Sequence, residues 1–526
     1  MKDMNRKQFL YTASMGIGAL FFSGFTGFLA QPQPQKKETT YHQKKILIIG
    51  SGYGGAVAAL RLCEQGHKVT MLEMGMDWGK AKEKFSSMLH PDKSAAWLRT
   101  KTIAPFFNLF SVPKFTGVLD RWDFPHVKIW MGRGVGGGSL VNGGMAVTPK
   151  QSYFKEIFPQ LDTDAFYTKY FPLANQELGV NVAPEDFLKE CEYYRFSRVG
   201  EMEAHKAGFK TVRVPNVYDF DYMQKEYKGE VPASALAGEV IYGNNHGKKS
   251  LDKTYLKKAL ATGNLEIWDL HQVDSILQID DTHYRIKVSE INTQGEVIQP
   301  KEITCEQLFL AAGTMGTLEI LLKSNVENGL PISEEVGKYW GNNGNFMTGR
   351  NFVQTFSGGT GTKQSTIPVA GIDHWDDEEH SFFTEIAPLP MGMNVATALY
   401  LMVNPLKKYG TVSYDKSKGI QLDWDDSHTQ HMMDNAKYFI RKMNRANGGT
   451  RSHLLFHNGF GPDICYHPLG GVVLGKATNA FGRLNRHKNL YVVDGSLVPG
   501  TIGVNPFVTI VALAEYCMEH ITKELS

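Results

Sequence analysis

Short apolar runs separated by glycine turns mark the first part of the chain. Residues 44–49 form an apolar run bounded by lysines and a glycine, which is typical of a buried strand. Apolar residues at helical spacing predict a helix over 53–66, and residues 68–73 predict the next parallel strand. A strand, a glycine turn, a helix and a strand within about thirty residues form the unit that binds a dinucleotide.

The same pattern returns further along the chain and predicts strands over 263–268, 272–276 and 489–495. Over 308–316 it predicts a strand that continues into a glycine turn and a helix, and over 507–525 it predicts a closing helix. Aromatic residues, prolines and short irregular segments interrupt it twice. The fold class that follows is α/β: a discontinuous Rossmann-like cofactor domain with an inserted α+β substrate domain, a β-sheet covered by helices.

These interruptions predict the domain boundaries. Residues 1–40 precede the fold as a signal and linker. The cofactor domain takes residues 41–77, 249–340 and 482–526, and the substrate domain takes 78–248 and 341–481.

Composition and charge exclude several classes of protein. The chain has 526 residues and a net charge of +2, and no long basic run appears, so nucleic acid is not an indicated partner. Its five cysteines are scattered and lack a CxxC pair, which argues against a metal cluster or a disulfide framework and predicts buried, unpaired thiols. We therefore expect no metal site. The cysteines are Cys63, Cys191, Cys305, Cys465 and Cys517.

The N-terminus has the pattern of an export signal. Lys2, Arg6 and Lys7 precede an uncharged run over 9–30. Residues 5–10 resemble a twin-arginine signal, with Lys7 in place of the second arginine. The predicted location is secreted or periplasmic. A retained membrane anchor is the alternative, because about 20 apolar residues can span a bilayer.

The first glycine motif, at 50–55, suits a phosphate-containing cofactor. Gly50 permits the tight turn, Gly52 lets a pyrophosphate approach the helix N-terminus, and Gly55 allows the helix to pack closely on the strand. Glu73 follows the second strand, where it would accept hydrogen bonds from the ribose hydroxyls of an adenosine.

A second glycine segment lies about 80 residues downstream. Residues 132–144 hold seven glycines and one charge, Arg133. So many glycines persist only where backbone approaches something closely, because each costs conformational entropy. Two backbone cradles suggest one long cofactor, and a second cradle with a helix cap suits a flavin better than a nicotinamide. Arg133 could contact the cofactor or form an interdomain ion pair.

These motifs resemble the glucose–methanol–choline (GMC) flavin oxidoreductases and, within that family, the bacterial cholesterol oxidases that bind FAD non-covalently. The resemblance covers about 44–522. The segments that carry it are 50–55 with Glu73, 132–147, 212–219, 240–247, 465–471, 491–499 and 503–509.

The resemblance implies non-covalently bound FAD. Asn142, Gly143 and Met145 would border the flavin ring and Val273 the adenine, while plain core packing remains the alternative for Met145. The cofactor-binding residues that it implies are Gly50, Gly52, Tyr53, Gly54, Gly55, Glu73, Gly138, Asn142, Gly143, Met145, Val273, Asp494, Gly495, Asn505 and Phe507.

The resemblance also implies oxidation of a 3β-hydroxysterol to the 3-ketone, with O2 as acceptor and H2O2 as product, and isomerisation of the 5-ene to the 4-en-3-one. His467 would accept or hold the hydroxyl proton. Glu385 would carry a proton from C4 to C6 of the sterol; its pattern alone also fits a strand acid facing water. Asn505 would contact flavin and substrate, and Asn505-Pro506 also reads as the N-cap and first residue of the last helix.

The sequence departs from the resembling family in two places, at Ile464 and in the segment between Glu73 and Gly132, which is shorter than in that family. Ile464 stands where a phenylalanine is usual beside the active site. The apolar stretch 103–113 could be a lid that contacts a membrane surface transiently, or buried core. We expect a monomer. The alternatives in function are a GMC dehydrogenase for another alcohol with a quinone acceptor, and a sterol-binding flavoprotein with little turnover.

Overall fold

A computed structural model describes residues 37–86, 91–99, 112–237, 243, 246–351, 365, 367–388, 397–451 and 463–525. Residues 39–526 form one unit, and every helix and strand named below belongs to it. The predicted export signal and most of the apolar stretch 103–113 lie outside the described residues. None of the described helices is long and apolar enough to cross a membrane.

The first glycine turn follows strand β1 of a mixed sheet of seven strands. The order of this sheet is β6-β2-β1-β9-β8-β7, and β18 also pairs with β9. The pairs among β1, β2, β6, β9 and β18 are parallel, whereas β7 and β8 add antiparallel pairs. The strands are β1 (Thr40–Ile49), β2 (Val69–Leu72), β6 (Leu265–Trp268), β7 (His271–Gln278), β8 (Tyr284–Ile291), β9 (Val297–Leu310) and β18 (Leu490–Val492).

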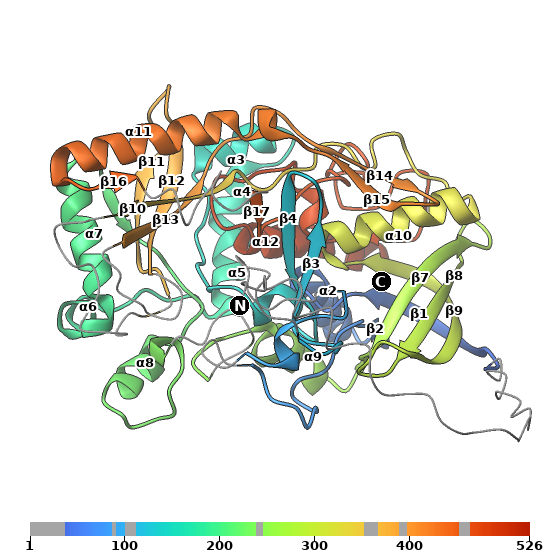
Figure 1. The fold of residues 1–526 in the computed structure, drawn as a ribbon. Coiled ribbons are helices and arrows are strands. Elements are labelled where there is room, and N and C mark those ends of the chain that lie inside the picture. The colour runs from blue at the N-terminus through green and yellow to red at the C-terminus, as the bar shows by residue number, and fades with distance from the viewer. Residues whose placement is uncertain are drawn as a thin grey trace, which may run out of the picture. The chain divides into compact units, whose positions relative to one another are not determined.

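The helices of this part are α2 (Tyr53–Glu64), α9 (Tyr255–Ala261), α10 (Gly313–Asn328) and α12 (Phe507–Leu525). α2 packs against α12 in Figure 1, and their facing side chains are buried. The predicted dinucleotide unit is confirmed: the strand, turn, helix and strand lie within a few residues of their predicted bounds. The later strands and the closing helix are confirmed as well.

A second, antiparallel sheet has the order β16-β10-β13-β12-β11-β5. The helices α7 (Arg195–Lys206) and α11 (Gln430–Asn447) pack on it, and Figure 1 shows α11 running along β10 to β13. This is the predicted β-sheet covered by helices, so the α/β fold class is confirmed. The strands are β5 (Thr211–Arg213), β10 (Asn345–Asn351), β11 (Ala370–His374), β12 (Phe382–Ala387), β13 (Thr397–Val403) and β16 (Thr450–Arg451).

A third, separate sheet has the order β17-β4-β3. Its strands are β3 (Leu119–Asp123), β4 (Val127–Gly132) and β17 (Asp463–Cys465). A separate hairpin joins β14 (Thr411–Asp415) and β15 (Gly419–Asp423). The other helices are α3 (Gln151–Ile157), α4 (Thr163–Ala165), α5 (Phe171–Leu178), α6 (Glu185–Glu190) and α8 (Phe220–Tyr227).

Although the inserted α+β domain is as predicted, short irregular segments do not dominate the two interruptions as their sequence pattern suggested. The interruptions contain α3 to α8, the whole second sheet and α11. In β12 all six residues are buried, so no alternation of polar and apolar positions marks it as a strand. The boundaries predicted at 77, 248, 340 and 481 stay a prediction.

All five cysteines are buried and unpaired, as predicted. Burial raises the pKa of each thiol, so none is a reactive thiolate. Within the described part of the chain, no group of three or more histidine, cysteine, aspartate or glutamate side chains could hold a metal ion.

Candidate active site

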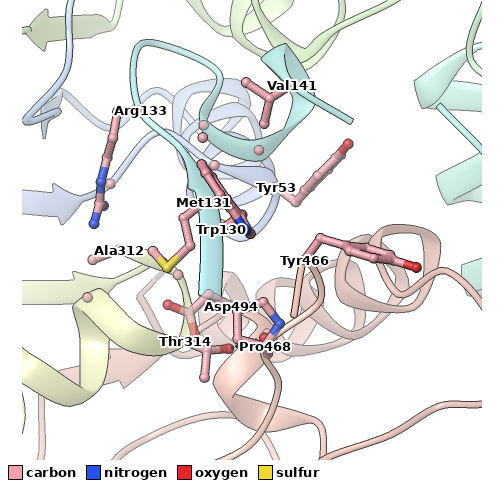
Figure 2. Close-up of a pocket in the computed structure, with 18 of the residues that line it drawn as sticks. Tyr53, Trp130, Met131, Arg133, Val141, Ala312, Thr314, Tyr466, Pro468 and Asp494 are labelled. Carbon is pink, nitrogen blue, oxygen red and sulfur yellow. Dashed lines mark hydrogen bonds between the residues drawn. The ribbon is translucent and has the colours of Figure 1, made fainter. Parts of the chain in front are cut away.

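A cavity of about 500 Å³ draws its walls from all three sheets. Figure 2 shows side chains from separate elements around it, including Tyr53, Trp130, Tyr466 and Asp494. Of the predicted site residues, Gly55, Glu385 and Asn505 are not in its walls, although Ala387 and Pro506 are. Those that line it are Gly50, Gly52, Tyr53, Gly54, Glu73, Gly138, Asn142, Gly143, Met145, Val273, His467, Asp494, Gly495 and Phe507.

The first glycine turn opens onto this cavity. Gly50 has φ of +99°, and a Cβ there would lie 2.2 Å from the Ala311 carbonyl oxygen, so the turn requires glycine. α2 then begins at Tyr53, with Gly52 as an N-cap that has no side-chain hydrogen bond. A helix N-terminus of this kind binds an anion with its free N–H groups and its dipole.

The second glycine segment lies directly against this turn. After β4 it enters the short 3-10 helix η2 (Gly137–Leu140). A Cβ on Gly137 would lie only 2.9 Å from the Cα of Gly52. The Ser51 hydroxyl oxygen lies 3.2 Å from the Gly134 carbonyl oxygen and accepts from the Gly136 N–H at 3.0 Å. One ligand in the cavity can therefore touch both segments, as two cradles for one cofactor require.

Glu73 closes the turn from the end of β2. Its Oε2 accepts from the N–H of Ser51 at 3.1 Å and from the hydroxyl of Ser51 at 2.6 Å. Its Oε1 accepts from the N–H of Gly75 at 2.9 Å. A carboxylate offers about four acceptor positions, so one stays available to a ribose hydroxyl.

Arg133 forms an ion pair within the third sheet. Its Nε and Nη2 donate to Oδ2 of Asp120 on β3 at 2.9 and 2.7 Å. Both side chains are buried, and Arg99 reaches Oδ1 of the same carboxylate at 3.2 Å. The pair is therefore local, not interdomain. Arg133 also lines the cavity, so a contact with a cofactor remains open to it.

A stacked aromatic pair joins α2 to α12. Tyr53 lies over Phe507 with ring centroids 5.0 Å apart and planes 12° apart. The Asn142 side-chain amide donates to the Tyr53 hydroxyl, and Asn142 Oδ1 is buried with no partner among the described residues. Asp494 caps the short helix η9 (Gly495–Leu497) by accepting from Ser496, and burial raises its pKa.

α12 has its predicted bounds, but its N-cap lies one residue later than predicted. Its first residue is Phe507, and the Pro506 carbonyl accepts the bond from the Ile510 N–H at 2.9 Å. Pro506 therefore occupies the N-cap position, and the assignment of Asn505 as N-cap is wrong. Freed from capping, the Asn505 side chain hydrogen-bonds to Glu385 instead.

The pairing of β17 with β4 brings His467 to the glycine segment. The two strands run parallel, so both chains leave the sheet at the same edge. His467 Nδ1 lies 3.2 Å from the Asn345 side-chain nitrogen, which can only donate. Burial lowers the pKa of His467 to about 3, so the ring is neutral at physiological pH. A neutral ring whose Nδ1 accepts carries its proton on Nε2, where it can donate to a substrate oxygen.

Glu385 lies on β12 and is 1% exposed. Burial raises its pKa to about 8, while the hydrogen bond from Asn505 acts in the opposite direction. Its Oε1 has no partner among the described residues. The alternative of a strand acid that faces water is therefore wrong in one respect. Glu385 does lie on a strand, but its carboxyl is buried.

The strand register places Glu385 on the cavity face of the second sheet. Glu385 lies opposite Leu401, and Ala387 lies opposite Leu399, so these four side chains share one face. Met347 of β10 pairs with Leu401 on the same face. The last four of these residues line the cavity, together with Pro368 and Ile464. The carboxyl therefore lies beside a wall that is almost entirely apolar.

Several site residues were not predicted from the sequence. Ser51 could have been found, because it lies inside the first glycine motif. Asn345 and Tyr466 had weaker signals. Tyr466 precedes His467, and the two rings are 4.7 Å apart. Trp130 lines the cavity with a buried Nε1 that has no partner among the described residues, and nothing in its local pattern marked it.

Comparison with known families agrees with this site. The N-terminal model of the GMC oxidoreductases matches residues 45–340, which is more than half of the chain. Two C-terminal GMC oxidoreductase models match residues 343–457 and 410–514. The chain belongs to the GMC oxidoreductase family.

Individual proteins are similar to this GMC oxidoreductase over most of its length. A cholesterol oxidase of Acinetobacter baumannii is 24% identical, over 90% of this chain and 94% of that protein. A cholesterol oxidase of Mycobacterium tuberculosis is also 24% identical, over 89% of each chain. The crystal structure of pyridoxine 4-oxidase from Mesorbium loti superposes with a TM-score of 0.62 at 14% identity, over 91% of this chain and 99% of that one, and shows the same fold.

GMC oxidoreductases are flavoproteins, generally FAD-binding, and the residues present here fit such a cofactor. A Cβ on Gly138 would meet no atom within 4 Å, so this face of the glycine segment is open to the cavity. The helix N-terminus suits the pyrophosphate and Glu73 suits a ribose. When bound, FAD supplies the acceptor for the electron pair that leaves an alcohol carbon.

Gly138→Val should weaken FAD binding about tenfold or more, because the added side chain would occupy the cofactor's space. Gly138→Ala should have a smaller effect. FAD affinity is measured by fluorescence quenching on the stripped protein. The thermal midpoint of the stripped protein should not change in either variant. Wild-type FAD affinity in Gly138→Val would show that the cofactor does not lie along this segment.

Proposed function

We propose that this GMC oxidoreductase uses non-covalently held FAD to oxidise a 3β-hydroxysterol to the 3-ketone. O2 takes up the electrons and leaves as H2O2, and the 5-ene product is isomerised to the 4-en-3-one. The observation that carries the proposal is the convergence of His467, Asn505 and Glu385 beside an apolar wall. The relatives named cholesterol oxidase, similar over about nine-tenths of the chain, support it.

His467 serves the oxidation step in this proposal. Its Nε2–H donates to the substrate hydroxyl oxygen and fixes the alcohol against the flavin position. Asn345 holds the ring from the opposite nitrogen at 3.2 Å. This hydrogen bond orients the alcohol and stabilises negative charge on its oxygen as the carbon gives up its hydrogen with an electron pair. Because Nε2 already carries a proton, the hydroxyl proton passes to water.

Glu385 serves the isomerisation step. Its carboxylate takes a proton from C4 of the ketone and returns it to C6, so the double bond moves from C5–C6 to C4–C5. The apolar wall of Met347, Leu399 and Leu401 excludes water and suits a rigid hydrocarbon. The carboxyl oxygen Oε1 has no hydrogen-bond partner among the described residues, so no such bond has to break before it takes the proton.

Product analysis under air tests this function against its alternatives. The proposal expects one H2O2 for each 4-en-3-one formed from cholesterol. A quinone-dependent dehydrogenase of the same family would release no peroxide, and a sterol-binding flavoprotein would form no ketone. Acid precipitation should leave the flavin in the supernatant, since it is held without a covalent bond.

Isomerisation should follow the ionisation of Glu385. Because burial raises its pKa to about 8, the carboxyl is protonated below that pH and becomes a base above it. The rate with the 5-en-3-one supplied directly should therefore rise between about pH 6 and pH 9, with a midpoint near 8. A rate that is flat over this range, measured by absorbance of the conjugated ketone, would contradict Glu385 as the base.

We also propose that the chain is exported and acts as a monomer that touches membrane surfaces to reach sterol. The support is the sequence alone: the basic start, the uncharged run over 9–30 and the apolar stretch 103–113. Fractionation of the producing cells tests the export. A protein that stays in the cytoplasm would contradict it, and one that stays in the membrane would show a retained anchor.

A further inference from the structure

Residues 341–345, called here the support segment, lead into β10 and touch two parts of the chain that reach the site. One part contains His467. Gly341 and Leu469 exchange both of their main-chain hydrogen bonds at 3.0 Å, and the Asn345 side chain reaches the His467 ring. The other part is the loop 500–504, which ends directly before Asn505. The support segment therefore contacts both chain segments that carry the proposed catalytic residues.

Asn343 makes the contacts with the loop 500–504. Its main-chain N–H donates to the Gly500 carbonyl at 2.9 Å. Its side-chain Nδ2 donates to the Val504 carbonyl at 2.8 Å, and its Oδ1 accepts from the Ile502 N–H at 2.9 Å. The side chain is fully buried. Asn343 therefore binds every second residue of the loop.

The turn that carries Asn343 is itself fixed. The φ of Asn343 is +60°, a left-handed conformation that is costly for most side chains but more accessible to asparagine. Gly344 follows with φ of +65°, and a Cβ there would lie 1.9 Å from the Asn404 carbonyl oxygen. Asn342 Oδ1 accepts from the Gly344 N–H at 2.9 Å. Because the turn is held on its own side, Asn343 can fix the loop.

The loop leads directly to the site. Asn505 follows Val504 and hydrogen-bonds to Glu385, and Pro506 and Phe507 line the cavity where α12 begins. The bond from Asn343 to the Val504 carbonyl is thus one residue away from Asn505. It also lies next to the N-terminus of α12, which favours negative charge in front of it.

We propose that Asn343 is a positioning residue for Asn505 and for the first turn of α12. Asn343 is not in the walls of the cavity, so it acts through the loop. Together with Asn345, which holds His467, it makes the support segment a common anchor for both sides of the site. For α12 the proposal rests on flavin binding by the family, and for Asn505 it rests on the proposed function.

The test compares Asn343→Gly with Asn479→Gly in the holoenzyme. Glycine adopts the left-handed conformation at 343 without strain, so the variant removes only the side-chain bonds. Asn479 is the matched control, because its Oδ1 accepts from the N–H groups of Phe481 and Arg483 at 2.9 and 3.0 Å, away from the cavity. Asn343→Gly should change the visible circular dichroism of the bound flavin and make its reduction potential more negative. Asn479→Gly should match the wild type in both, although the thermal midpoint should fall in both variants.

The pH profile of isomerisation tests the effect on Asn505. The hydrogen bond from Asn505 lowers the pKa of Glu385, so its loss in Asn343→Gly should raise the midpoint of the profile by about one pH unit or more. The 5-en-3-one is supplied directly, and Asn479→Gly should keep the wild-type midpoint.

The other neighbours of Glu385 should not shift this midpoint. Gly371 of β11 and Leu401 of β13, which lie opposite Glu385, do not titrate. Burial raises the pKa of Tyr466, so its hydroxyl stays neutral over the range of the test. The buried ion pair of Arg350 with Glu203 of α7 lies on the other face of the sheet, because Arg350 pairs with Ala398.

A purely structural asparagine would give a different result. A lower thermal midpoint with a wild-type flavin spectrum, potential and pH midpoint in Asn343→Gly would overturn the proposal. A changed flavin with an unchanged pH midpoint would overturn it for Asn505 alone. If the wild type does not isomerise the 5-en-3-one, the proposed function fails, and the flavin spectrum and potential still decide the role of Asn343.

Asn343→Asp takes the place of Asn343→Gly if the latter does not fold. This variant keeps an acceptor for the Ile502 N–H but puts a second acceptor against the Val504 carbonyl. It should show the same changes in the flavin and in the pH midpoint. Wild-type values of all three measurements in Asn343→Asp would equally overturn the proposal.

Discussion

Glu385→Gln should stop the movement of the double bond while oxidation continues. The product would change from the 4-en-3-one to the 5-en-3-one, with isomerisation slower by about 10²–10⁴-fold. Glutamine has the shape of the protonated carboxyl and still accepts the bond from Asn505, but it cannot take a proton from carbon. Because the pKa of Glu385 is raised to about 8, the neutral substitute should leave the thermal midpoint unchanged.

Chromatography of the sterol products measures this effect. Glu379→Gln is the matched control, since Glu379 precedes the same strand and is exposed. Its products should be those of the wild type. An unchanged yield of 4-en-3-one from Glu385→Gln would remove Glu385 from the reaction, whereas loss of both steps would mean that it also serves the oxidation.

His467→Ala should slow reduction of the flavin by alcohol by about 10²–10⁴-fold. The variant removes the Nε2–H that would hold the substrate hydroxyl and leaves the Asn345 amide without its partner. The rate of flavin reduction in His467→Gln should lie between the rates of His467→Ala and the wild type, because the glutamine amide can donate a hydrogen bond near the position of Nε2. Stopped-flow absorbance of the flavin measures the step directly.

The same variants should isomerise the 5-en-3-one at close to the wild-type rate, because that step belongs to Glu385. This separates a role in oxidation from general damage to the cavity. Rapid flavin reduction in His467→Ala would contradict the assignment. A parallel loss of isomerisation would show that the substitution disturbs the apolar wall instead.

The cofactor half of the fold could be predicted from the sequence. Its strands are short apolar runs that end in glycine turns, and residues 46–49 of β1 are all buried, as a parallel strand requires. α12 carries apolar residues over its whole length, and its predicted bounds, 507 and 525, are those observed. Here the local pattern and the tertiary environment agree.

The second sheet could not be predicted in the same way. β12 is buried on both faces, so it has no period of two. Its sheet also takes in β5, whose Arg213 pairs with Ala370 of β11, so the sheet joins distant parts of the chain. α11 was missed although its signal exists. Met432, Ala436, Phe439, Ile440 and Met443 are buried at helical spacing.

The candidate site likewise contains residues that could be predicted from the sequence and residues that could not. Gly50, Gly52 and Glu73 follow from one local motif, so they could be placed without tertiary information. Asn345 joins the site through its contact with His467, more than 100 positions away. No local pattern announces such contacts. The Asn505–Pro506 cap was misplaced by one residue because either residue fits a helix start by composition.

Anaerobic mixing of the holoenzyme with cholesterol tests most directly whether the enzyme oxidises a sterol. We expect the absorbance of oxidised flavin to be lost in one turnover and one equivalent of 4-en-3-one to form. Sterol that binds without loss of this absorbance, while another alcohol causes it, would contradict the claim and leave a GMC oxidoreductase with a different substrate.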